Sequence, residues 1–170
     1  DRDDEFRILI DKSRLKLKLG NFSDALELSE QAAKIAEEIG ISEGVAESLI
    51  EKTNALIFLK DFSAAKISAE KAVRILEAIN AGELWRAFYV SAIAEKEETD
   101  EKSSGKIETN LRRAVEILEQ MCGQFSAEDE ARRKLFIESH NAPEKDLCDF
   151  FLSQNRIMEA EKIKKKWLLD

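Results

Sequence analysis

Apolar residues recur three and four positions apart along most of the 170-residue chain, and this pattern itself repeats at a fixed period. When residues 19–40 are laid over residues 59–80 without gaps, nine of 22 positions are identical. In the first copy these are Leu19, Phe22, Ser23, Ala25, Glu30, Ala32, Ile35, Glu37 and Ile39. Such spacing indicates amphipathic helices, and a fixed period of about 20 to 50 residues is typical of stacked repeats. The sequence therefore predicts an array of similar helical units.

Each unit is predicted to be a hairpin of two helices. Short breaks interrupt the apolar pattern at Gly20-Asn21 and, one period later, at Lys60-Asp61. Polar and glycine residues between two periodic segments are typical of turns. A similar break at Asn155 predicts a final hairpin near the end of the chain.

Four units and one extra helix account for the sequence. The predicted units cover residues 3–40, 41–80, 81–122 and 143–170, and the extra helix covers 126–139. The predicted fold class is all-α, a right-handed α-solenoid of antiparallel helix hairpins in a single repeat domain, residues 1–170. Because the sequence begins at Asp1 without a methionine, we expect this domain to be a fragment of a larger protein.

Three segments resemble tetratricopeptide repeats (TPR). They are Leu-Gly-Asn-Phe-Ser-Asp-Ala at 19–25, Thr-Asn-Ala-Leu-Ile-Phe-Leu-Lys-Asp-Phe-Ser-Ala-Ala at 53–65, and Asn-Arg-Ile-Met-Glu-Ala at 155–160. The offset between residues 19–40 and 59–80 is longer than the usual repeat of about 34 residues. It is similar to the long-helix variant of kinesin light chains and of many bacterial signalling and transcriptional regulators. The resemblance implies a helical scaffold that binds other proteins.

Charge and cysteine content exclude several classes of function. The chain has 27 basic and 35 acidic residues, spread evenly, for a net charge of −8. Nucleic-acid binding depends on Lys and Arg neutralising phosphates, so neither nucleic acid nor an anionic membrane is an expected partner. No apolar run is long enough to span a membrane. Two cysteines without a CxxC spacing favour a reducing compartment, and we expect a cytoplasmic location.

The sequence offers no catalytic constellation. It contains one histidine, His140, and neither a GxSxG motif nor a phosphate-binding glycine loop. Its carboxylate pairs, such as Glu47 with Glu51, are common in acidic helical proteins and lack a predicted enclosing pocket. We therefore expect no enzyme activity, no cofactor and no metal.

The first helix of each unit is expected to line a concave groove that binds a partner. In this interpretation Arg14 and its basic neighbours hold an acidic stretch of ligand, while apolar side chains hold an anchor residue. Asn54 aligns with the groove asparagine of the TPR family, whose amide binds a peptide backbone. The predicted groove residues are Arg7, Arg14, Lys18, Ile50, Asn54, Ile57, Phe58, Val90 and Ala94.

The leading hypothesis is a non-catalytic scaffold that binds a peptide or helix of a protein partner, or of its own parent chain. The alternative is a sensor or regulatory arm of a signalling protein or transcription activator, which binds a small effector or an attached output domain. Weak self-association through Trp167 is a third hypothesis. The acidic segment 95–107 is expected to form a mobile loop, open to modification at its serines.

Overall fold

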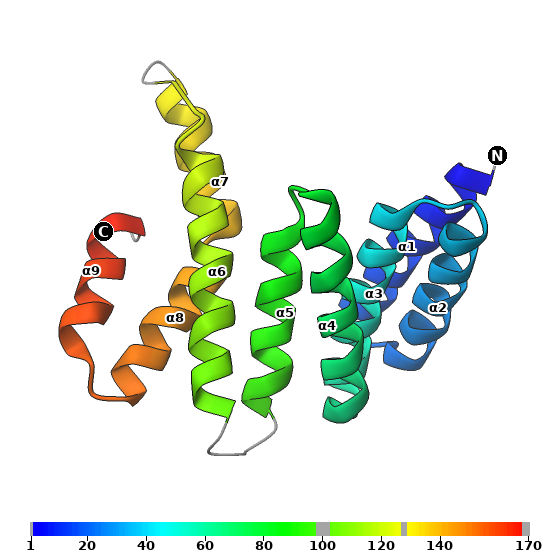
Figure 1. The fold of residues 1–170 in the computed structure, drawn as a ribbon, viewed down its shortest axis with the longest axis horizontal. Coiled ribbons are helices and arrows are strands. Elements are labelled where there is room, and N and C mark those ends of the chain that lie inside the picture. The colour runs from blue at the N-terminus through cyan, green and yellow to red at the C-terminus, as the bar shows by residue number, and fades with distance from the viewer. Residues whose placement is uncertain (1, 98–102, 127–128, 168–170) are drawn as a thin grey trace. The chain divides into compact units, whose positions relative to one another are not determined.

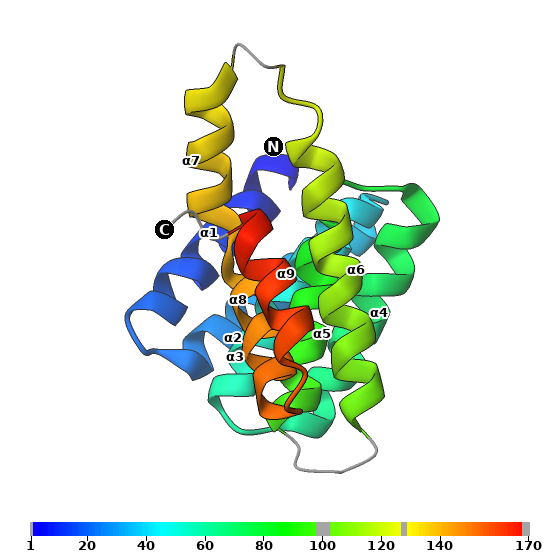
Figure 2. The same ribbon diagram turned by 90° about the vertical axis from the view of Figure 1, so that its left-hand side faces the viewer.

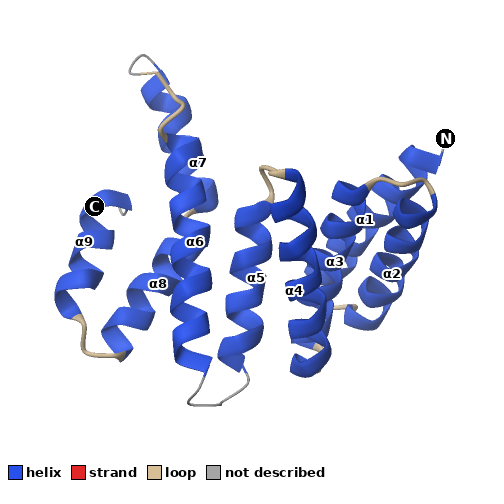
Figure 3. Cartoon of the chain, viewed as in Figure 1, coloured by secondary structure: helices blue, strands red, loops and turns tan. Residues whose placement is uncertain are grey.

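A computed structural model describes residues 2–97, 103–126 and 129–167. Within these ranges the chain forms nine helices and no strand (Figure 3). The helices are α1 (Arg2–Lys18), α2 (Phe22–Glu38), α3 (Ser42–Phe58), α4 (Phe62–Ile79), α5 (Leu84–Glu97), α6 (Ser104–Cys122), α7 (Glu130–His140), α8 (Ala142–Ser153) and α9 (Ile157–Trp167). The all-α class is confirmed, and the helix hairpins α1–α2, α3–α4 and α8–α9 are as predicted, whereas the third predicted hairpin, at 81–122, stays a prediction.

Contacts divide the chain into two compact units, residues 1–107 and 108–170. The boundary falls inside α6, within the predicted third repeat at 81–122. A single repeat domain over the whole chain therefore stays a prediction, and each compact unit is described by itself below.

The first compact unit contains two complete hairpins, α1 with α2 and α3 with α4, followed by α5 (Figure 1). Alanines at the contacts, such as Ala25 and Ala65, are completely buried and let the helices approach closely. The core between them is filled by larger side chains, among them Phe6, Ile10 and Leu76. The repeated pattern of small and large residues thus builds the main core and a smaller cluster of Leu56, Ala65 and Ala94.

The same turn ends the helices of successive hairpins. After α1, the Gly20 N–H donates to Leu17 O and the Asn21 N–H to Lys16 O, at 3.1 and 2.9 Å. This pair of bonds is the Schellman motif, which needs a left-handed residue at its centre. Its centres along the chain are Gly20, Gly40, Lys60, Asn80 and Asn155, with φ between 49° and 77°. The turns predicted at Gly20-Asn21 and Lys60-Asp61 are confirmed.

The second compact unit contains the hairpin of α8 and α9, which is orange to red in Figure 2. Cys148 lies in α8 with its Sγ 3.8 Å from Ala160 O. The hydroxyl of Ser13 donates to Ala25 O at 2.8 Å in the first hairpin, over the same separation along the chain. Both small side chains are buried where two helices meet. Packing between helices therefore explains why a small residue such as Cys148 stands at this position.

Salt bridges join α6 to this last hairpin. Arg156 contacts Glu108 and Glu159, both at 2.6 Å, and Arg112 contacts Glu159 at 2.9 Å. The guanidinium groups of Arg112 and Arg156 lie 4.9 and 4.6 Å from the ring centroid of Phe151. Arg156 lowers the pKa of both Glu108 and Glu159. The arginines therefore serve as packing surfaces as well as charges.

The predicted loop at 95–107 is wrong at both ends. Helix α5 continues to Glu97, α6 begins at Ser104, and residues 98–102 lie outside the described part of the chain. Glu95 is buried beside Lys66 and Lys106, at 4.0 and 3.5 Å. The helix continues through these charged residues because Glu95 forms ion pairs with lysines of other helices. Ser103 is buried as well, so it is not open to modification.

The extra helix predicted at 126–139 is α7, which begins at Glu130 and ends at His140. Residues 127 and 128 lie outside the described ranges, as do residues 168–170 and the side chain of Trp167. Self-association through Trp167 therefore stays a prediction.

Lys60 occupies a backbone conformation that glycine occupies in the first hairpin, with φ 63° against 77° at Gly20. Because a side chain in this left-handed region is strained, Lys60→Gly should stabilise the protein by about 0.5 to 1 kcal/mol. The matched change Gly20→Lys should destabilise it by a similar amount. Urea unfolding of both variants measures the effect, and a destabilised Lys60→Gly would contradict it.

Candidate functional site

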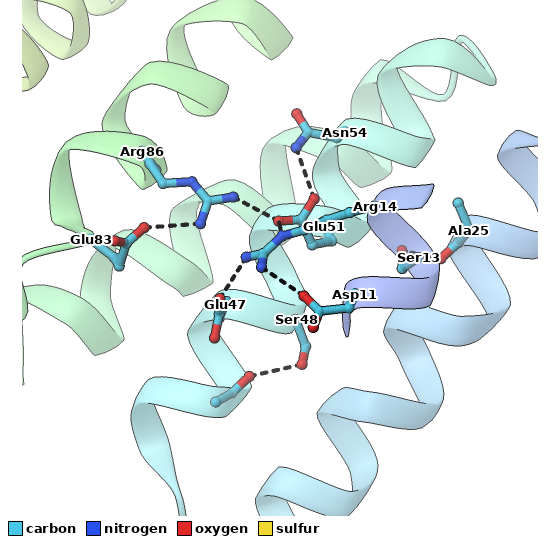
Figure 4. Close-up of polar contacts among 11 residues, drawn as sticks. Asp11, Ser13, Arg14, Ala25, Glu47, Ser48, Glu51, Asn54, Glu83 and Arg86 are labelled. Carbon is cyan, nitrogen blue, oxygen red and sulfur yellow. Dashed lines mark hydrogen bonds and ion pairs between the residues drawn. The ribbon is translucent and has the colours of Figure 1, made fainter. Parts of the chain in front are cut away.

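Three helices of the first compact unit are joined by a buried carboxylate. Glu51 of α3 is 2% exposed. Its Oε1 accepts from Arg14 Nε of α1 at 2.8 Å and from Arg86 Nη2 of α5 at 2.6 Å (Figure 4). We call Arg14, Glu51 and Arg86 the Arg–Glu bridge. It connects the first helices of the two hairpins with α5, because α3 lies in contact with both α1 and α5.

Further polar groups surround the bridge. Arg14 also contacts Glu47 at 2.5 Å and Asp11 at 3.3 Å. Arg86 contacts Glu83 at 2.9 Å, and Asn54 Nδ2 donates to Glu51 Oε2 at 3.4 Å. Four carboxylates thus share two guanidinium groups, and the cluster carries a net negative charge.

The acids hold Arg14 in its charged form. Burial by itself would lower the pKa of Arg14, but hydrogen bonds and charge attraction from Glu51 and Glu47 outweigh burial and raise that pKa. The donors of Arg14 are therefore turned toward the protein itself. That Arg14 holds an acidic stretch of ligand stays a prediction.

Three predicted groove residues are buried, so the prediction that they contact a ligand is wrong. Ile50 and Ala94 are fully buried, and Val90 is 6% exposed. Ile50 and Val90 belong to the main core, and Ala94 packs with Leu56 and Ala65. The helix face opposite the hairpin contact is covered because α3 packs against α1 and α5 as well as against α2 and α4.

The other predicted groove residues reach the surface to different degrees. Arg7 is exposed and pairs with Asp3 at 3.4 Å, and Lys18 is exposed at the end of α1. Asn54 and Ile57 are half-buried. Phe58 is 57% exposed, and its ring stacks on Phe22 with centroids 4.6 Å apart and planes 5° apart.

Sequence reasoning missed Arg86 and the internal role of Glu51. Glu47 and Glu51 were recognised as a pair on one helix face, but such pairs are usually solvated. Arg86 gave no signal, because Phe6 and Ala46 occupy its place in the two preceding repeats. Only the packing of α5 against α3 brings Arg86 to Glu51.

The second compact unit contains a cavity of about 380 Å³. Side chains of both charges line it together with apolar and small residues: Glu116, Glu119, Gln120, Cys122, Gly123, Arg133, Ile137 and Lys166. Lys166 pairs with Glu119 at 2.7 Å. The volume lies in the range of pockets that take small ligands.

Glu144 is a buried carboxyl in the same unit. It is fully buried at the start of α8, and neither carboxyl oxygen has a hydrogen-bond partner within the described ranges. Burial raises the pKa of Glu144 to about 7, against a smaller lowering by the residue's own backbone N–H, and the negative charge of Glu119 adds to the rise. Glu144 therefore takes up a proton on folding near neutral pH.

Metal-binding clusters of three or more His, Cys, Asp or Glu residues do not occur in the described ranges. Cys122 and Cys148 are both free and buried. Among the helices described here, none combines the length and apolarity that a membrane crossing requires.

Comparisons with known proteins identify the fold. The chain is similar to the crystal structure of BtubC (BKLC) from P. vanneervenii, with a TM-score of 0.66 and 19% identity over 97% of this chain. It is similar to the apo form of RapI, with a TM-score of 0.65 and 14% identity over 96% of this chain. The chain spans 65% of the length of BtubC and 67% of that of RapI.

A weaker likeness, with a TM-score of 0.44, is to the TPR-like repeats of a putative kinesin light chain from Podosopora anserina. It has 18% identity and covers 95% of this chain and 92% of that one. No protein-family profile and no curated protein sequence matches the chain. The chain shares the helical fold of BtubC and RapI, and its helix hairpins and left-handed turns agree with the resemblance to TPR-like repeats predicted from the sequence.

Removing the central charge of the bridge should destabilise the first compact unit. Glu51→Gln leaves two half-buried arginines short of a carboxylate, which should cost about 2 to 3 kcal/mol. The control is Glu37→Gln, since Glu37 makes an exposed interhelical pair with Lys71 and should contribute less than about 1 kcal/mol. Urea unfolding compares them, and equal small losses would contradict a structural role for the bridge.

Glu144 should make the second compact unit less stable as the pH rises. The raised pKa means that the folded state keeps a proton which the unfolded state releases above about 4.5. Stability is therefore full below that pH and falls through about 7, by up to about 3 kcal/mol. Melting temperatures at pH 5.5 and 8.0 should differ less in Glu144→Gln than in the original chain. The exposed control Glu138→Gln should keep the original difference, and a Glu144→Gln chain that also keeps it would refute this assignment.

Proposed function

We propose that this chain is a protein-interaction module that binds a short peptide at the C-terminal ends of α1 and α3. The single observation that supports it most is the exposed, stacked ring of Phe58. Exposed aromatic residues on a rigid element are typical of interaction sites, because little side-chain entropy is lost when they are covered.

The surroundings of Phe58 suit a peptide. Leu19 and Leu59 are 64% and 40% exposed at the ends of the same two helices. Together with Phe58 they are three large apolar side chains exposed to water at this end of the two helices, and covering such side chains with a partner is favourable. When the two repeats are aligned, Lys18 occupies in α1 the position that Phe58 occupies in α3. A ligand with an apolar anchor beside a carboxylate fits this arrangement.

The Arg–Glu bridge supports the site without contacting the ligand. Asn54 lies one helical turn before Phe58, and Glu51 lies a further turn before Asn54. By fixing α3 between α1 and α5, the bridge holds Phe58 and Lys18 in constant relative positions. This pre-organisation raises affinity by lowering the ordering cost of binding.

The alternative function, a sensor or regulatory arm, is supported by a different observation. The cavity of about 380 Å³ in the second compact unit has the size for a small effector. Its mixed charges, with Glu116 and Glu119 near Arg133 and Lys166, suit a zwitterionic ligand. Binding there would be independent of Phe58.

Peptides selected from a random library against the immobilised full chain test the leading proposal. Isothermal titration of a selected peptide should show that Phe58→Ala weakens binding about 30-fold, equivalent to about 2 kcal/mol. Lys18→Glu should weaken it about five-fold or more. The matched control is Ile67→Ala, which removes an apolar side chain that is 66% exposed on α4.

Unchanged binding to the Phe58→Ala chain would reject the proposed peptide site. Failure to select any peptide, combined with a small ligand that raises the melting temperature of the Phe58→Ala chain, would favour the sensor function instead.

A further inference from the structure

The outer side of α1 carries large apolar residues that no part of the described chain covers. Ile8 is 51% exposed and Leu15 is 56% exposed, one after the other along the same helix face. With Asp4 and Lys12 they occupy four positions that have counterparts in the first helices of the next two repeats, α3 and α5. We call these four positions the stacking register.

In α3 the stacking register faces the second helix of the preceding hairpin. Its residues there are Gly44, Ser48, Lys52 and Ala55. A methyl group at Gly44 would lie 2.7 Å from the Phe6 ring of α1 and 3.2 Å from the Cβ atom of Ala36 in α2, so this position meets both helices of the preceding hairpin. Lys52 Nζ lies 2.7 Å from Glu30 Oε1, also in α2. Ser48 and Ala55 are fully buried.

In α5 the same register again faces the preceding second helix. Its residues there are Leu84, Phe88, Ala92 and Glu95. Glu95 lies 4.0 Å from Lys66 of α4, and Leu84 packs on the core to which α4 contributes Ala72 and Leu76. Phe88 is 6% exposed. Large residues in the stacking register can therefore pack closely against a neighbouring helix when that helix presents small side chains, as α4 does with Ala72.

From this continuity of an established interface we propose that the outer face of α1 binds an amphipathic helix of a protein partner. That helix would resemble α2 and α4, with Ala or Ser toward Ile8 and Leu15 and an acidic residue toward Lys12. The acid follows from Glu30, which pairs with Lys52, the counterpart of Lys12. Glu70 occupies the same place in α4.

This site is distinct from the one under Proposed function. Its anchors are Ile8 and Leu15 of α1, whereas the anchor of the other site is Phe58 of α3; Leu19 of that site lies one helical turn beyond Leu15. The occupant also differs, because a whole helix is required to cover two turns of α1, whereas a short peptide suffices at Phe58.

Fluorescence anisotropy with a labelled synthetic peptide of residues 61–80, the α4 segment, tests the proposal on the full chain. We expect saturable binding that Ile8→Glu and Leu15→Glu each weaken at least about ten-fold. Ile67→Glu, a matched change at another exposed apolar residue of the first compact unit, should alter it less than about two-fold. Because the substituted side chains are exposed, circular dichroism should show unchanged folding.

Reversing the charges of Lys12 and of Glu70 in the peptide tests whether these two residues pair as the stacking register predicts. Lys12→Glu should weaken binding of the peptide, and a peptide carrying Glu70→Lys should restore it. Phe58→Ala should leave binding unchanged, which separates this result from that of the proposed peptide site.

Three outcomes would overturn the proposal. One is that the peptide does not bind, and another is that Ile8→Glu and Ile67→Glu weaken its binding equally. The third is a dimer of the chain in sedimentation velocity that Ile8→Glu dissociates, since a second copy would then be the occupant of this face.

Discussion

The arrangement of the helices in the first compact unit depends on a buried carboxylate that requires positively charged partners. Glu51 is almost completely buried, and a buried charge is tolerated only when paired charges and hydrogen bonds replace the lost water. Arg14 and Arg86 supply both, from helices on either side of α3. Their positions therefore fix how α1, α3 and α5 lie against one another. The two surfaces that we propose bind partners, at the C-terminal ends of α1 and α3 and on the outer side of α1, lie away from these arginines.

The repeat pattern predicted the backbone closely, because the residues that form it act locally. Gly20 and Lys60 take the same left-handed conformation at the same place in their hairpins, and Ala25 and Ala65 are buried at the same contact. These features depend on nearby residues of the same hairpin. The loop at 95–107 was mistaken at its start because Glu95 is buried beside Lys66 and Lys106, and Lys66 lies far away in sequence.

The candidate site was harder to predict, because periodicity gives the face of a helix but not the number of neighbours around it. Ile50 was assigned to an open face, yet α3 packs against α1, α2, α4 and α5. Arg86 has no counterpart in the first two hairpins, so no repeat could reveal it. Phe58 was correctly placed at the surface, while its stacking on Phe22 became visible only in three dimensions.

Coupling between Arg14 and Arg86 tests the central claim most directly. Free energies of unfolding would be measured for Arg14→Met, Arg86→Met and the double variant. If Glu51 connects the two arginines, the double variant should lose at least about 1 kcal/mol more than the two single losses together. Losses that add to within about 0.5 kcal/mol would show that the arginines act independently and would contradict the account.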